Sequence, residues 1–91
     1  MRKISDLVEV TIEDEGIMVS FDDDVLPPIA KVAAAEHMRP TIEGIVAAGA
    51  SQYDAIHTLK AAAVRWLSTE ATCGRLVPVK GRWQYRTLSG S

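Results

Sequence analysis

Residues 41–67, TIEGIVAAGASQYDAIHTLKAAAVRWL, decide the fold because they predict two helices joined by a tight turn. In the second helix, apolar side chains recur at three- and four-residue steps, which places them along one face. These residues are Ile56, Leu59, Ala63, Trp66 and Leu67. Ser51 can cap this helix, and Gly49 suits the reversal before it because glycine takes a positive φ without steric cost. The stretch therefore predicts a pair of crossing helices.

A further helix is predicted upstream of this pair. Pro28 suits its first turn, where the missing backbone N–H leaves no hydrogen bond unmade. Pro40 biases the residue before it away from helical backbone. We therefore expect this helix to end at about His37 and a separate one to begin at Thr41. Residues 28–73 are thus predicted to form a core of three helices.

An acidic β-hairpin is predicted over residues 7–21. Apolar residues alternate with polar ones on both sides of the turn signal Asp-Glu-Gly at residues 14–16. One face of the hairpin is then apolar and the other acidic. A two-stranded hairpin alone is not stable in water, so its apolar face must cover the helices or a second copy of the chain.

A second, basic hairpin is predicted over residues 74–88. The stretch RLVPV leads into a Lys80-Gly81 turn, and RWQYRTL follows with strict alternation. Trp83, Tyr85 and Thr87 share one face of the second strand, which can pack on the helices. The polar side chains of the other face stay in water.

The length and composition of the chain suit one small domain. Of its 91 residues, 47% are hydrophobic, which is enough for a core, so we expect a single domain over residues 1–91. The predicted order of hairpin, helices and hairpin makes this domain α+β. It contains no run of eighteen apolar residues, so no membrane span is expected. The single cysteine, Cys73, cannot form an internal disulfide, and a reducing, cytoplasmic setting fits best.

Charge is distributed unevenly along the chain. Residues 1–38 hold nine acids and three bases, whereas residues 39–91 hold seven bases and three acids. The first part therefore carries a net charge of about −6 and the second about +4. A molecule with one basic side is typical of nucleic-acid binding.

The sequence does not favour catalysis or a cofactor. His37 and His57 are isolated, no Cys/His cluster has the spacing of a metal site, and no glycine-rich phosphate loop follows a strand. The three acids at residues 22–24 lack the spacing and the glycine turn of a calcium loop, so they are interpreted as a strand end and helix cap. We expect no enzyme activity, no metal and no cofactor.

The predicted order of elements resembles a winged helix-turn-helix domain. The turn at residues 49–51, the helix that follows it through Trp66-Leu67, and the basic hairpin carry the resemblance. The stretch GRLVPVKGRWQYR, residues 74–86, is similar to the GRLV…GR-x-YR pattern in the wings of many bacterial and phage regulators. The resemblance covers residues 28–88, and the acidic hairpin at residues 7–21 departs from it.

This resemblance implies sequence-specific binding of double-stranded DNA by a transcriptional regulator. In the family, the helix after the turn enters the major groove, and the wing contacts the adjacent backbone or minor groove. The residues of this chain at the reading positions are Ser51, Gln52, Tyr53, His57 and Lys60. Those at the wing positions are Lys80, Arg82, Gln84 and Arg86.

A homodimer is also expected, because the operators of helix-turn-helix proteins usually have two half-sites. The apolar residues of the hairpin at 7–21 can pair across a two-fold axis. Its acids would then keep that end of the protein away from the DNA. This places the predicted dimer interface in the N-terminal hairpin.

Two alternatives stay open. Residues 16–26, followed by two helices, resemble the strand and first helix of a ribbon-helix-helix repressor or antitoxin, in which Met18 and Ser20 would face the DNA. The other alternative is a small phage or accessory protein that binds another protein through its acidic hairpin. Such a protein needs an exposed apolar patch or a basic partner.

Overall fold

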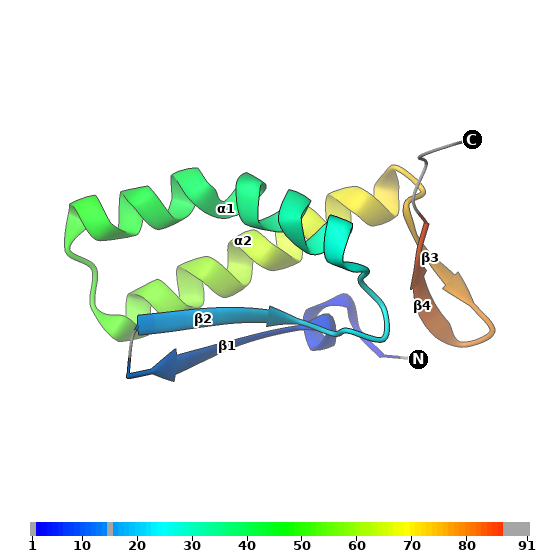
Figure 1. Cartoon of the computed structure of the whole chain (residues 1–91), viewed down its shortest axis with the longest axis horizontal. Coiled ribbons are helices and arrows are strands. Elements are labelled where there is room, and N and C mark those ends of the chain that lie inside the picture. Colours follow the sequence, from blue (N-terminus) through cyan, green and yellow to red (C-terminus); the bar gives the residue numbers. More distant parts are fainter. Residues whose placement is uncertain (1, 15, 87–91) are drawn as a thin grey trace.

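The computed structural model describes residues 2–14 and 16–86, and it has an α+β fold (Figure 1). A short 3₁₀ turn, η1, precedes two hairpins that flank two long helices. In chain order the elements are η1 (Ile4–Leu7), β1 (Val8–Glu13), β2 (Gly16–Phe21), α1 (Pro28–Ala48), α2 (Gln52–Thr72), β3 (Leu76–Val79) and β4 (Arg82–Tyr85). No helix in the described ranges is both long and apolar enough to cross a membrane.

The prediction of three helices is wrong, because α1 continues through Pro40. The proline removes the N–H that would bond to the carbonyl of Glu36, but both residues are exposed, so water can take the place of that bond. Met38 and Ile45, on either side of the proline, pack into the same core. Tertiary packing therefore outweighs the local helix-breaking tendency, and the described chain has a helical hairpin in place of the three-helix core.

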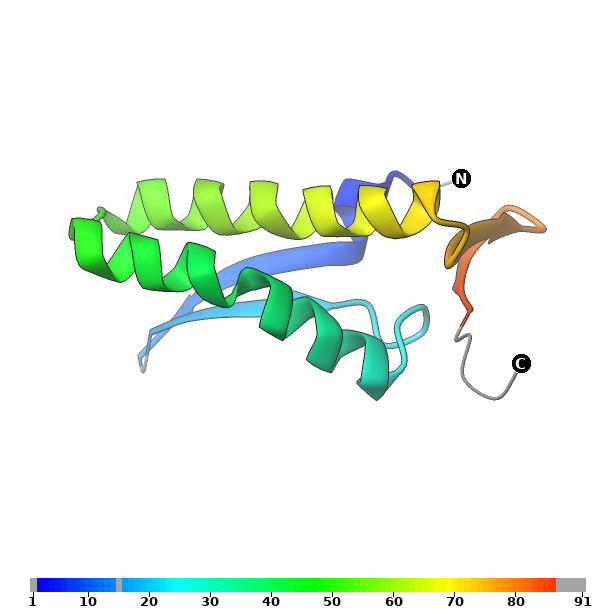
Figure 2. The same cartoon turned by 90° about the horizontal axis from the view of Figure 1, so that it is seen from above.

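The turn between the helices forms as predicted. Gly49 ends α1 with a φ of 62°, and its N–H donates to the carbonyl of Val46 at 3.2 Å. Ser51 is the N-cap of α2, where its hydroxyl accepts a hydrogen bond from the backbone N–H of Asp54 at 3.2 Å. The two helices consequently lie side by side in opposite directions (Figure 2).

The N-terminal hairpin is confirmed. β1 and β2 are antiparallel, with Val8 opposite Phe21 and Glu13 opposite Gly16. Val8, Val10, Ile17, Val19 and Phe21 pack into the core, and the ring of Phe21 meets that of Trp66 of α2 edge to face, with 6.0 Å between centroids. The acids of the strands point to the opposite, solvent face. In Figure 1 the two helices form a layer above this hairpin.

The C-terminal hairpin is also confirmed, within residues 76–85. β3 and β4 are antiparallel, and the connecting Lys80 and Gly81 have φ values of 52° and 77°. Two successive positive φ values are typical of the tight turns that join twisted strands. Tyr85 stacks on Trp66, with ring centroids 6.3 Å apart, so the aromatic face packs on α2 as expected. The predicted positions of Thr87 and Leu88 lie outside the described residues.

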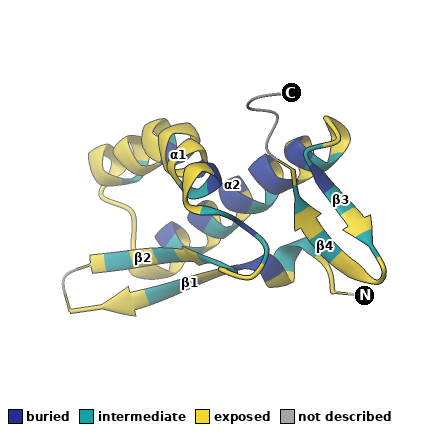
Figure 3. Cartoon of the chain, turned by 45° about the vertical axis from the view of Figure 1, so that its right-hand side comes forward, coloured by how far each residue is buried: buried dark blue, intermediate teal, exposed yellow. Residues whose placement is uncertain are grey.

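The core is built around α2 (Figure 3). Buried residues occur along the whole of this helix, whereas α1 buries only Ala30, Ala34 and Met38. Leu7 and Leu26 extend the core from the segments on either side of the N-terminal hairpin, and Val8 of β1 and Leu76 of β3 are also buried in it. Most of α1 is therefore open to solvent, although the helix is rich in alanine, isoleucine and valine.

Candidate functional site

A buried carboxylate holds the C-terminal hairpin on α2. Glu70 is 5% exposed and accepts three hydrogen bonds: from Arg75 Nε at 3.0 Å, from an Arg75 terminal nitrogen at 2.6 Å, and from the Tyr85 hydroxyl at 2.6 Å. The Arg75 guanidinium, helped by the Tyr85 hydroxyl, keeps the pKa of the Glu70 carboxyl below its ordinary value. Both carboxylate oxygens are occupied, so this group is a structural anchor.

Tyr85 is the other titrating member of the anchor. Burial, followed by the nearby Glu70 carboxylate, raises the pKa of the Tyr85 phenol to about 12. The hydroxyl therefore stays protonated and keeps donating its hydrogen bond over the whole neutral range. The orientation of the hairpin relative to α2 is consequently insensitive to ordinary changes of pH.

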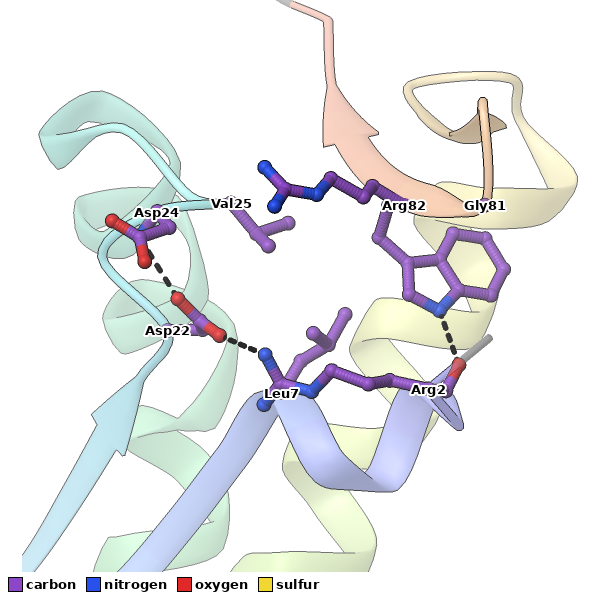
Figure 4. A pocket seen from close by; sticks show the side chains of 8 residues that line it. Arg2, Leu7, Asp22, Asp24, Val25, Gly81 and Arg82 are labelled. Atoms are coloured by element: carbon purple, nitrogen blue, oxygen red, sulfur yellow. Dashed lines mark hydrogen bonds and ion pairs between the residues drawn. The ribbon is translucent and has the colours of Figure 1, made fainter.

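A cleft of about 560 Å³ lies between the two hairpins, beside the N-terminus (Figure 4). Arg2 forms an ion pair with Asp22, and its backbone carbonyl accepts a hydrogen bond from the indole nitrogen of Trp83 at 2.7 Å. Arg82 extends over the cleft toward Val25. The Arg2 guanidinium keeps the pKa of the Asp22 carboxyl below its ordinary value. Charges of both signs line the cleft, and Arg2 and Asp22 pair with each other, so the cleft has no strong excess of one charge that would select a charged ligand.

A second hollow, of about 400 Å³, runs between β2 and α1. It is lined by Ile17, Val19, Ser20, Phe21, Asp23, Lys31, Ala35, Met38 and Ile42. Most of these side chains are apolar, and they come from two elements that leave a gap between them. Ser20 belongs to the opposite face of the sheet, so its presence shows that the hollow extends round the edge of the strand. We call this hollow the β2 groove.

The backbone of β2 is open along the β2 groove. The N–H of Asp22 donates to the carbonyl of Leu7 at 2.9 Å, which makes these residues a hydrogen-bonded pair of the hairpin. Because hydrogen-bonded and non-bonded pairs alternate in an antiparallel ladder, Ile17, Val19 and Phe21 direct their backbone groups away from β1. In the described chain no third strand joins this sheet, so those groups face outward.

The outer edge of β1, unlike that of β2, is partly covered by a side chain of α2. Lys60 extends from α2, and its ammonium donates to the backbone carbonyls of Ser5, at 2.8 Å, and Val8. An extended ammonium at an edge blocks the addition of another strand. The same contacts remove Lys60 from the set of free DNA-reading side chains, in which the resemblance to a winged helix-turn-helix domain places it.

The predicted DNA-contacting residues fall at opposite ends of α2. Ser51, Gln52, Tyr53 and His57 lie at its first turns, where the rings of Tyr53 and His57 meet with 4.4 Å between centroids. The wing positions Lys80, Arg82, Gln84 and Arg86 lie beyond its last turn, and all are exposed. A helix of 21 residues is about 30 Å long, so the two sets do not form one surface. The reading positions and the wing positions are each open to solvent, but on different parts of the molecule.

No protein-family model, no curated protein sequence and no solved structure matches this chain. What the protein does is therefore inferred from its own surfaces and side chains. Within residues 2–14 and 16–86, no group of three or more His, Cys, Asp or Glu residues is placed to hold a metal ion.

Neither the β2 groove nor the Glu70 anchor is evident from the amino-acid sequence alone. The alternation at residues 17–21 predicts an apolar strand face, but it carries no information about which edge of the strand stays open. In the sequence Glu70 is one acid of a helix, and its partners Arg75 and Tyr85 lie beyond the end of that helix. The one signal that pointed to it was its place in the otherwise apolar three- and four-residue spacing of α2, after Ala63, Trp66 and Leu67.

Proposed function

We propose that this protein binds another protein by accepting an extended segment along the β2 groove. The observation that carries the proposal is the open backbone of β2 beside an apolar hollow. A strand added to a sheet edge gains main-chain hydrogen bonds, and its alternate side chains enter whatever lies beside the edge. Here the backbone groups of Ile17, Val19 and Phe21 would form the hydrogen bonds, and Ala35 and Ile42 would receive the side chains.

The charges around the groove specify the chemistry of the segment. Glu13 and Asp14 lie at one end of β2, and Asp22 and Asp23 lie at the other. Lys31 already pairs with Asp23, so one basic group is held there by the protein itself. An incoming segment with apolar residues at its centre and lysine or arginine at both ends would be complementary to this surface.

A second copy of β2 fits this edge less well. Antiparallel pairing of β2 with itself, centred on Val19, places Asp24 of one copy beside Asp14 of the other. Like charges opposite each other in a sheet destabilise the pairing. The acidic ends thus favour a basic partner over the expected dimer through residues 7–21.

Fluorescence polarisation with three labelled peptides tests this function. The peptide KKVTVTVKK carries the proposed pattern, EEVTVTVEE reverses its charge, and KKVTPTVKK removes a central backbone donor. We expect binding of the first peptide in the micromolar range, with at least about tenfold weaker binding of the other two. Equal affinity for the first two peptides, or no binding near millimolar concentration, would refute the proposal.

Variants of β2 locate the binding edge. Val19→Pro removes an outward N–H without touching the bonds to β1, and Asp23→Lys reverses one acid at the groove. Both should weaken binding of KKVTVTVKK by about tenfold. Glu9→Lys makes the same charge change on the solvent face of β1 and should have a smaller effect. Circular dichroism establishes that each variant is folded, and full affinity in a folded Val19→Pro variant would contradict the assignment.

Binding of double-stranded DNA is the second candidate, favoured by the exposed bases of the C-terminal hairpin. Lys80, Arg82 and Arg86 are all exposed, whereas Arg75 is occupied by Glu70. Such bases would contact phosphates without reading sequence. Asp22 and Asp24 share the cleft with Arg82, and their negative charge would repel DNA phosphates, so DNA binding is placed second.

A salt series on random duplex DNA tests the second candidate. Replacing Arg82 and Arg86 together with alanine should reduce the slope of log affinity against log salt by about 2, because each phosphate contact contributes nearly one unit. Arg65→Ala, an exposed arginine of α2, is the matched control. An unchanged slope in the double variant would remove the C-terminal hairpin from DNA binding.

A further inference from the structure

The helix side of the β2 groove is a single stripe of α1. The residues of this stripe are Lys31, Ala35, Met38 and Ile42, and all four line the groove. They follow one another at steps of four and three residues, so they form one line along the helix. Three of them have long or branched side chains, whereas the exposed Ala35 ends at its Cβ. The groove therefore has most room beside Ala35.

The position of Ala35 along the strand follows from the course of the chain. Helix α1 runs back along β2 in the opposite direction (Figures 1 and 2). The ion pair between Lys31 and Asp23 fixes the start of the helix beside the end of the strand. Ala35 lies about 6 Å further along α1, and Phe21 lies about 7 Å back along the strand, so the two are at the same level. By the same count Ile42 lies near the start of β2.

The β2 groove is consequently asymmetric in shape. At the Phe21 end, beside Ala35, an added side chain finds open space. At the start of β2 the side chain of Ile42 already occupies the helix side of the groove. The charges do not share this asymmetry, because two acids lie at each end of the strand. A bound segment is therefore oriented by the sizes of its side chains and not by its charges.

The pairing geometry decides which side chains of a bound segment enter the groove. Residues paired with Ile17, Val19 and Phe21 lie on the same face of the sheet as these residues, which is the face toward the helices. Antiparallel pairing is somewhat more stable than parallel pairing. It puts the first of three inward residues opposite Phe21 and the last opposite Ile17. The first then meets Ala35, and the last meets Ile42.

We propose that the β2 groove selects an extended segment bound antiparallel to β2, whose first inward residue is large and apolar and whose last is smaller. Ala35 sets this order, because it leaves the space that the large side chain fills. This specificity rests on the proposed binding function and adds to it the direction and the residue order of the partner. From its N-terminus the segment has basic residues, a large apolar residue such as phenylalanine, two smaller apolar residues at alternate positions, and basic residues again.

Two isomeric peptides test the order of residues. KKFTVTVKK places phenylalanine opposite Phe21, and KKVTVTFKK places it opposite Ile17. The first should bind about tenfold more tightly, because its ring is buried in open space and not against an occupied wall. The peptides have the same composition and charge, so unspecific attraction affects them equally. Equal affinities, or tighter binding of KKVTVTFKK, would overturn the proposal.

The peptide KKVTVTVKK, measured beside the isomers, separates this specificity from the binding function itself. If KKVTVTVKK binds and the two isomers are indistinguishable, the groove accepts a strand without reading its order, and only the specificity is refuted. If none of the three peptides binds near millimolar concentration, the specificity and the binding function are both refuted.

Variants of α1 test the role of Ala35. Ala35→Leu fills the open end and should weaken binding of KKFTVTVKK by about tenfold, while KKVTVTVKK changes by less than about threefold. Ala33→Leu is the matched control, since Ala33 is exposed on the same helix but does not line the groove, and it should leave the preference intact. Ile42→Ala opens the other end and should strengthen binding of KKVTVTFKK by about threefold.

Circular dichroism establishes that each variant is folded. Ala35→Leu and Ile42→Ala act at opposite ends of the groove, so each is a test on its own if the other does not fold. An unchanged preference between the isomers in either folded variant would overturn the assignment of the pocket. So would a loss of preference in Ala33→Leu as large as that in Ala35→Leu.

Paramagnetic labels on the peptide test its direction. A nitroxide at the N-terminal end of KKFTVTVKK should broaden the backbone amide NMR signals of Asp22 and Asp23, and one at its C-terminal end those of Asp14 and Gly16. An extended peptide of nine residues is about 30 Å long, so its two ends affect different residues. The reverse pattern would indicate parallel binding, and broadening at both ends of β2 by either label would indicate binding in both directions. Either result overturns the proposal.

Discussion

Replacement of Glu70 by glutamine should reveal how strongly the C-terminal hairpin is attached to α2. The substitution keeps the shape of the side chain but removes its charge and turns one acceptor oxygen into a donor. Breaking a buried ion pair on one side costs about 3–5 kcal/mol. Arg75 retains 33% of its side-chain exposure, so its guanidinium can regain water, and we expect a loss of about 2–3 kcal/mol.

Urea unfolding followed by tryptophan fluorescence measures this loss, since Trp66 lies against Tyr85 in the anchor. Tyr85→Phe removes only one hydrogen bond to the carboxylate and should cost about 1–2 kcal/mol. Glu9→Gln makes the same chemical change as Glu70→Gln on an exposed strand residue and should stay within about 0.5 kcal/mol. A Glu70→Gln variant as stable as this control would refute the anchor.

The dependence on pH supplies a second check. Because the folded pKa of Glu70 lies below its ordinary value of 4.5, its contribution to stability is present above that pH and is lost as the pH falls through the folded pKa. The difference between the parent and Glu70→Gln should therefore shrink in acid. Tyr85 has its pKa raised from 10.0 to about 12, so its contribution is complete below pH 10 and falls as the pH rises toward 12. A difference that stays constant in acid would contradict the assignment of Glu70.

The remaining predictions concern the helices, and urea midpoints measure all of them. Pro40→Ala should stabilise the protein by about 1–2 kcal/mol, because it restores a helical hydrogen bond at an exposed site; destabilisation would mean that the proline is required by the fold. Gly49→Ala should cost about 1 kcal/mol at its φ of 62°, whereas Gly44→Ala, where a new Cβ meets no atom within 4 Å, should gain a similar amount. Equal effects at the two glycines would contradict this. Leu67→Ala should cost about 2–5 kcal/mol, against little change for the exposed Val46→Ala in dilute protein.

The incomplete burial of the N-terminal hairpin and of α1 has one physical cause. Among the described elements, α2 has buried side chains along most of its length, from Ala55 to Glu70, and it packs against both the apolar face of the N-terminal hairpin and α1. One helix can cover only a limited number of apolar side chains, so part of the apolar surface of the hairpin and of α1 stays exposed. The β2 groove and the exposed apolar residues of α1, among them Ile29, Val32 and Val46, are places where this surplus is exposed.

Most local features of the fold followed from short stretches of sequence. Alternation around residues 14–16 and around Lys80-Gly81 predicted both hairpins, and the structure confirms them. Gly49 and Ser51 predicted the end of one helix and the start of the next. These predictions succeed because a turn or a cap depends on the backbone freedom and hydrogen bonding of a few adjacent residues.

The number of helices and the arrangement of the charged residues were decided only by the tertiary structure. Pro40 has a local cost, but Met38 is buried in the core and the partly buried Ile45 packs against the same core, so the packing of both favours a helix that continues between them. Lys60 was expected to face DNA, yet α2 lies beside the start of β1 and brings its ammonium to two backbone carbonyls. The reading and wing positions are separated because α2 is long and straight between them. In each case the deciding energy comes from groups far apart in the chain, which a local pattern does not contain.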